Sequence, residues 1–243
     1  MPYRRLPNTD KARLKALKIA FSRGKELPPF KLAFSQKSNQ RLQSFLNRYE
    51  NAMSFYNQNF IKQTNKNRQY LASMKKARMY ISHFIQVVNM SIMRGEMQSE
   101  IRKYFGLNLN ESRIPSLNTE NDIIYWGEKL IKGEAQRILG GAAPVTNPTI
   151  AIVKVRYETF MEAYHYQKTL QKNTARTQEE LTKLRKEADN IILSMWNEVE
   201  DSFKDLPDDL RREKAREYGI VYVYRKNEIS AFSLYDSRQS GAG

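Results

Sequence analysis

The chain has 243 residues, of which 40% are hydrophobic and 28% are charged, a composition typical of a globular protein rather than a disordered one. It contains no cysteine, which excludes disulfides, thiolate metal sites and cysteine nucleophiles and fits a reducing compartment. No stretch approaches about 18 uncharged apolar residues, and no apolar run follows the charged N-terminus. The sequence therefore predicts a cytoplasmic location, with neither a membrane span nor a secretory signal.

The formal net charge is +15, and it is distributed unevenly along the chain. Residues 1–50 contain 12 basic and three acidic residues, and residues 51–95 contain seven basic residues and no acid. The remaining 148 residues contain 22 basic and 23 acidic residues. An excess confined to one part of a chain indicates a face for an anionic partner. The alternative is a solubilising charge that happens to fall on one half.

The first predicted element is an amphipathic helix near residues 9–23. Three of its lysines recur at i, i+4 and i+7, which places them on one side of the helix beside an apolar stripe. We expect this helix to dock by its apolar stripe and to present its ammonium groups outward. The Arg4–Arg5 pair precedes it as a short basic arm.

Apolar residues then recur with a helical period over residues 38–94 and again over 148–204. We interpret each stretch as a long antiparallel helical hairpin, with the first turn in the polar segment 62–68. Three shorter helices complete the prediction, at 96–105, 119–139 and 208–218.

Two stretches of the chain are nearly alike, "RYENAMSFY" at 48–56 and "RYETFMEAY" at 156–164. Each is followed later by an aromatic residue, a glycine and an aliphatic residue, in "RKYFGL" at 102–107 and "AREYGI" at 215–220. Because order, spacing and ending agree, we interpret the sequence as a duplicated helical hairpin.

Alternating residues at 220–224 predict a strand after the second glycine. It could pair with "LNLN" at 107–110 or with a second strand at 229–235. The sequence thus predicts a mainly α protein, in which two duplicated αα-hairpins pack as a four-helix bundle, with an extra N-terminal amphipathic helix and a small C-terminal β-ribbon. The expected parts are a basic arm and helix at 1–37, a basic first hairpin at 38–118, a connecting helix and loop at 119–147, a second hairpin with its strand at 148–235, and a disordered tail at 236–243.

The motifs of catalysis are poorly represented. Glu162 and His165 have the Glu-x-x-His spacing of a carboxylate metal site, but the second pair that a di-metal site needs is missing, because Tyr80 precedes the other histidine, His83, at that spacing. No phosphate-binding glycine loop and no G-x-S-x-G motif occurs. We therefore expect a non-enzymatic protein with no catalytic residue, metal or cofactor. A metal-dependent enzyme that uses Glu162 and His165 is a third hypothesis.

The basic residues of the first 95 positions, interspersed with Asn and Gln, suit contacts to phosphate and sugar. We expect a helical protein that binds an anionic polymer, with RNA or a ribonucleoprotein surface preferred over DNA because no recognition helix for the major groove is evident. The candidate nucleic-acid-binding residues are Arg4, Arg5, Lys11, Lys15, Lys18, Lys62, Lys66, Arg68, Lys75, Lys76 and Arg78.

The alternative is a structural or assembly protein of a larger cytoplasmic or viral particle. Its basic half would contact acidic protein partners, and residues 220–224 would offer a strand edge to a partner or a second copy.

Overall fold

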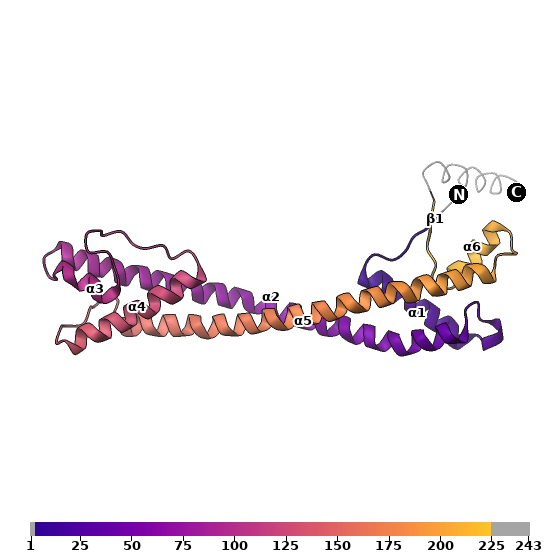
Figure 1. The fold of residues 1–243 in the computed structure, drawn as a ribbon, viewed down its shortest axis with the longest axis horizontal. Coiled ribbons are helices and arrows are strands. Elements are labelled where there is room, and N and C mark those ends of the chain that lie inside the picture. Colours follow the sequence, from indigo (N-terminus) through magenta and orange to yellow (C-terminus); the bar gives the residue numbers. More distant parts are fainter. Residues whose placement is uncertain (1–2, 225–243) are drawn as a thin grey trace, which may run out of the picture. The chain divides into compact units, whose positions relative to one another are not determined.

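The computed structural model describes residues 3–224, which are mainly helical, as predicted (Figure 1). The elements are β1 (Tyr3–Arg4), α1 (Asp10–Glu26), the 3₁₀ helix η1 (Pro29–Lys31), α2 (Gln36–Met93), the 3₁₀ helix η2 (Ser99–Ile101), α3 (Arg102–Phe105), α4 (Glu120–Leu139), α5 (Ile150–Ser202), α6 (Asp208–Arg216) and β2 (Tyr222–Val223). The chain forms two compact units, unit 1 from residues 1–58 with 175–243, and unit 2 from residues 59–174. The predicted strand at 229–235 and the tail at 236–243 lie outside the described residues.

The two predicted hairpins are wrong. Residues 36–93 form the single helix α2, and residues 150–202 form the single helix α5. The polar segment at 62–68 suggested a turn, but neither helix contains a glycine or proline, so nothing interrupts the backbone hydrogen bonding. The polar side chains of that segment lie on an exposed part of a helix instead of at a hairpin tip.

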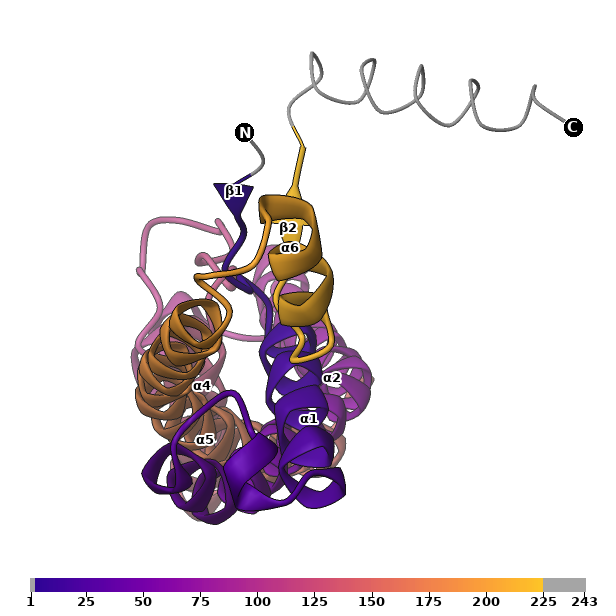
Figure 2. The same cartoon turned by 90° about the vertical axis from the view of Figure 1, so that its right-hand side faces the viewer.

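Unit 1 contains α1, the first part of α2, the last part of α5, and α6 (Figure 2). Ser38 in α2 donates a hydrogen bond of 2.6 Å to Glu198 in α5. Further along α2, Arg48 pairs with Glu187, which comes earlier in α5, so the two helices run antiparallel. The fully buried side chains of the unit 1 core include Leu17, Leu42, Phe45, Tyr49 and Trp196.

Unit 2 contains the last part of α2, α3, α4 and the first part of α5. Thr119 and Asp122 form a capping box that starts α4 at the predicted position. The rings of Phe84 in α2 and Phe105 in α3 meet edge to face, with centroids 5.6 Å apart. α3 also approaches α4 closely at Gly133, where an added Cβ would lie 2.2 Å from the carbonyl oxygen of Tyr104. The absence of a Cβ at Gly133 therefore allows these helices to pack so closely.

The repeated stretches of sequence occupy matching places in the order of the elements. A short helix, a long helix and a second short helix occur in α1–α3 and again in α4–α6. Tyr49 donates to Asp10 of α1, and its counterpart Tyr157 packs on Gly127 of α4, so each tyrosine meets the short helix that precedes its own. Gly106 and Gly219 both have positive φ, at 68° and 86°. The repeat is thus helix–long helix–helix in form rather than a hairpin, and its origin by duplication stays a hypothesis.

The predicted strand at 220–224 exists in part, but its partner differs from both predictions. β2 pairs antiparallel with β1, and Tyr3 lies opposite Val223. The Arg5 amide adds a hydrogen bond of 2.8 Å to the carbonyl of Val221. The segment 107–110 belongs to unit 2, whereas the N-terminal arm and β2 both belong to unit 1. A two-residue strand in a basic arm has too few alternating residues to be recognised in the sequence.

We expect Gly133→Ala to lower the Tm by about 5 °C or more, because overpacking a close backbone contact costs roughly 1–3 kcal/mol and outweighs the better helix propensity of alanine. Thermal unfolding followed by circular dichroism measures this change. The control is Gly140→Ala, where the nearest atom to an added Cβ is 3.4 Å away. An unchanged Tm for Gly133→Ala would contradict the close approach of α3 to α4.

Candidate functional site

Folding distributes the positive charge over both units. Unit 1 has 24 basic and 17 acidic residues, a net charge of +7, and unit 2 has 17 basic and nine acidic residues, a net charge of +8. The asymmetry along the sequence is therefore not an asymmetry between the units. Acidic residues from the C-terminal half join the basic N-terminal half in unit 1.

In unit 1 these acids form ion pairs with cations of the N-terminal segment, often across more than 130 positions of sequence. The pairs are Arg4 with Glu200, Arg13 with Asp189, Arg23 with Glu217 and Arg48 with Glu187. All of these acids lie in α5 or directly after α6. Much of the basic charge that the sequence suggested for a partner is thus neutralised within the protein.

Asp10, the first residue of α1, is the centre of the most connected of these networks. Its carboxylate accepts two hydrogen bonds of 2.7 Å from Arg185 and one of 3.0 Å from the Tyr49 hydroxyl. The hydrogen bonds from Arg185 hold the pKa of the Asp10 carboxyl below its ordinary value, although partial burial opposes the shift. Burial, together with the charge of Asp10, raises the pKa of the Tyr49 hydroxyl. This network joins α1, α2 and α5, which makes its role structural.

Unit 2 has a comparable junction at Glu120, the first residue of α4. Glu120 accepts a hydrogen bond from the Tyr70 hydroxyl of α2 and pairs with Lys168 of α5 at 2.9 Å. Burial tends to raise the pKa of the Glu120 carboxyl, but the hydrogen bonds from Tyr70 and Lys168 outweigh it and lower that pKa.

A buried ion pair holds the loop that follows α4. Glu134 and Arg137 make two hydrogen bonds of 2.8 Å and are almost completely buried. Glu134 also accepts from the amide of Val145, and Arg137 donates to the carbonyl of Ala143. Both charged groups of this pair therefore have their partners inside unit 2.

The five candidate residues of unit 1 do not form one surface. Arg4 is paired with Glu200, and Lys18 with Glu50 at 2.5 Å. Arg5 and Lys15 are exposed and line the same pocket, which contains Trp196 as well. Lys11 is exposed and lies outside that pocket.

The six candidate residues of unit 2 all lie in α2 and are all exposed. We call them the basic segment: Lys62, Lys66, Arg68, Lys75, Lys76 and Arg78. None of them pairs with an acid in the described part of the chain. The cations of unit 2 that do form ion pairs are Arg94, Lys132, Arg137, Lys154 and Lys168. The basic segment thus keeps its charge available for a partner.

Apolar side chains accompany part of the basic segment. Leu71 and Met79 are 52% and 44% exposed, and together with Lys75 and Arg78 they line a groove of about 590 Å³ along the outer face of α2. All residues that line this groove belong to α2.

The pair proposed for a metal site gains no further ligands from the fold. Glu162 and His165 are both exposed on α5. Among residues 3–224, no group of three or more His, Cys, Asp or Glu side chains is placed to hold a metal ion.

Sequence reasoning located the basic segment but missed two features. The acidic partners of Arg4 and Lys18 could not be assigned, because pairing across the fold leaves no pattern in the sequence. The pocket around Trp196 was also missed, since the helical spacing of Trp196 indicated only a core position. The indole N–H in an apolar stripe was the available signal, because a buried donor needs an acceptor.

Comparisons of the chain with family models, with curated proteins and with solved structures gave no match. None of the helices in residues 3–224 combines the length and the apolar content needed to cross a bilayer.

We expect Asp10→Asn to lower the free energy of unfolding by about 1–3 kcal/mol at pH 7, because Arg185 loses a charged partner in a half-buried site. The folded-state pKa of Asp10 is lowered, so its contribution is present above the unfolded pKa of about 3.9 and is lost as the pH falls through the folded pKa. The difference between wild type and variant should therefore shrink below about pH 4. Urea unfolding at several pH values measures it.

Asp209→Asn is the matched control, because the Asp209 side chain is 88% exposed and, among residues 3–224, pairs with Arg212 alone. Its effect should stay below about 1 kcal/mol at every pH. A destabilisation by Asp10→Asn that is as large at pH 3 as at pH 7 would show that its charge plays no part.

Proposed function

We propose that this protein is a non-enzymatic binding protein that engages an anionic polymer, RNA in preference to DNA, through the basic segment of α2. The observation that carries the proposal is the presence of six exposed cations within residues 62–78, none of which pairs with an acid in the described part of the chain. A cytoplasmic location is part of the proposal, and the absence of cysteine supports it because such a composition fits a reducing compartment.

The spacing of these cations suits a phosphate backbone. Lys62 and Arg78 are separated by roughly 24 Å along the helix axis, at about 1.5 Å per residue. Lys62 and Lys66 lie on one side of α2, one turn apart, whereas Arg68 and Lys75 share a different side. Because the cations point in several directions, they favour an irregular or single-stranded polymer over a straight duplex.

Neighbouring polar side chains strengthen this interpretation. Asn65 and Gln69 are exposed between the cations and can donate to phosphate or ribose oxygens. Such contacts carry little base information, so we expect recognition of shape and charge rather than of sequence.

The proposed binding surface contains fewer of the candidate residues than the sequence suggested. Arg4 and Lys18 are occupied by acidic partners, and Arg5 and Lys15 line a pocket in the other unit. Lys11 is exposed on α1 but stands apart from the other candidates, so we propose the binding surface in unit 2.

A second candidate function is assembly with an acidic protein surface. It is favoured by Leu71 and Met79, which are exposed beside Lys75 and Arg78 in the groove of α2. Mixed apolar and basic side chains suit a protein partner better than a phosphate backbone. The free edge of β2 would offer a second contact, since β1 is the only strand that pairs with it among residues 3–224.

We expect a labelled single-stranded RNA to bind in fluorescence anisotropy, with an affinity that falls steeply as the salt concentration rises. Lys62→Gln with Lys66→Gln, and separately Lys75→Gln with Arg78→Gln, should each weaken binding about tenfold. Each double variant should reduce the slope of log Kd against log salt by about 1.4, since each lost phosphate contact removes roughly 0.7. Duplex DNA of equal length is the comparison for RNA preference.

The matched control is Lys132→Gln with Lys154→Gln. Both lysines are exposed in unit 2 and pair with neighbouring glutamates, and the change in net charge is the same. An equal loss of affinity in this control would mean that net charge alone attracts RNA. If no RNA binds at low salt, and light scattering shows an oligomer that forms with rising concentration, the assembly function takes its place.

A further inference from the structure

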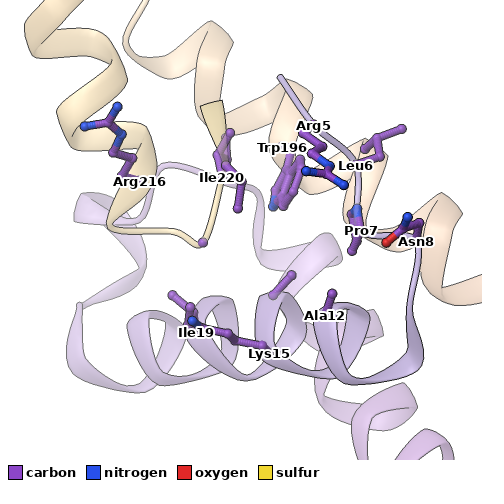
Figure 3. A pocket seen from close by; sticks show the side chains of 13 residues that line it. Arg5, Leu6, Pro7, Asn8, Ala12, Lys15, Ile19, Trp196, Arg216 and Ile220 are labelled. Atoms are coloured by element: carbon purple, nitrogen blue, oxygen red, sulfur yellow. The ribbon is translucent and has the colours of Figure 1, made fainter. Parts of the chain in front are cut away.

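A pocket in unit 1 is independent of the basic segment. It lies between the N-terminal segment 5–8, α1 and the residues that follow α6, and Trp196 of α5 forms one of its walls (Figure 3). Its volume is about 430 Å³, within the range of roughly 300–1,000 Å³ that small-molecule sites occupy. All of its lining residues belong to unit 1.

The backbone around the pocket is fixed by specific contacts. Gly219 has a φ of 86°, and its Cα lies so close to α1 that an added Cβ would be 3.3 Å from the Cβ of Ile19. The N-terminal segment is held to the residues that follow α6 by the pairing of β1 with β2. The hydrogen bond from the Arg5 amide to the carbonyl of Val221 adds to this pairing. The pocket therefore exists before any ligand binds.

The pocket wall is mainly apolar. Ala12 and Ile19 contribute from α1, and Figure 3 shows them across the cavity from Trp196 and Ile220. Leu6 extends the apolar surface at the side of the N-terminal segment. An apolar body of a ligand would be removed from water on several sides here.

The charges around the pocket are all positive. Arg5, Lys15 and Arg216 line it, and none of its thirteen lining residues is acidic. Arg5 and Lys15 are exposed and have no acidic partner among residues 3–224, whereas Arg216 bonds to the Tyr224 hydroxyl at 3.0 Å. Arg5 and Lys15 face the cavity from the N-terminal segment and from α1 (Figure 3), so its positive field favours a ligand with one anionic group.

Trp196 adds a polar group without a partner. Its side chain is 1% exposed, and its Nε1 has no hydrogen-bond acceptor among the described residues. A buried donor of this kind is uncommon in folded proteins.

We propose that this pocket binds a small amphipathic carboxylate, a molecule with one anionic head on an apolar chain or ring. The carboxylate would lie in the positive field of Arg5 and Lys15, and the apolar body would pack on Leu6, Ile19 and Val221, which are apolar lining side chains that are not fully buried. A nucleotide is a poorer fit, because the uncharged polar groups among the lining residues are limited to the Asn8 amide and the buried indole N–H of Trp196.

Tryptophan fluorescence tests the proposal directly. The chain has two tryptophans, so the full-length Trp126→Phe variant keeps Trp196 as its single reporter and leaves unit 1 unchanged. Bromine quenches a nearby indole at short range, and the probe is therefore 11-bromoundecanoate, used below its micelle concentration. We expect saturable quenching with a Kd at or below about 100 μM. The methyl ester of the same probe should bind at least about fivefold more weakly, because it lacks the charge.

Two variants in the Trp126→Phe background test whether Arg5 and Lys15 attract the carboxylate of the probe. Lys15→Gln and Arg5→Gln should each weaken binding of the probe about fivefold, the upper range for an exposed ion pair. Lys11→Gln is the matched control, because Lys11 is exposed one turn earlier on α1 and does not line the pocket. It should leave the Kd unchanged.

The absence of saturable quenching in folded protein would overturn the proposal. So would equal affinity for the acid and its ester, or an equal loss in Lys11→Gln and Lys15→Gln. The measurement contains no RNA, so its outcome is independent of the function proposed for α2.

Discussion

The unbroken backbone hydrogen bonding of α2 and α5 is the constraint on which the rest of the structure depends. Neither helix has a glycine or proline, so each continues through a polar middle section where few side chains are buried. A helix of this length cannot fold back to bury its own apolar stripe. Each long helix therefore contributes its two ends to two different cores, and the short helices α1 and α4 complete those cores.

The packing of the long helices also determines which cations are neutralised and which stay exposed. Because the last part of α5 packs against the N-terminal segment, Asp189 and Glu200 neutralise Arg13 and Arg4. The part of α2 in unit 2 meets fewer acids, and its cations remain exposed. The excess charge of the first 95 residues is thus partly an internal requirement of unit 1 and partly available to a partner.

Much of the local structure could be predicted from the sequence, because capping residues and helical periodicity are local signals. The helix expected at 119–139 begins at Glu120, directly after the capping box of Thr119. The hairpin turn at 62–68 was wrong because polarity alone was taken for a turn, although the segment contains neither glycine nor proline, the strongest signals for the end of a helix. At the candidate site, the exposure of Lys62 and Lys75 was predictable, but the pairing of Lys18 with Glu50 and the pocket at Trp196 depend on tertiary contacts.

The division into units also determines which part of the protein can fold first during synthesis. Unit 2 is one continuous segment, 59–174, and all of its residues are present before the ribosome reaches residue 175. Unit 1 needs both ends of the chain, so Phe45 and Leu46 lack their partners from α5 until the C-terminal segment emerges. The contiguous unit is therefore the first that can fold, and the unit built from both chain ends is the last.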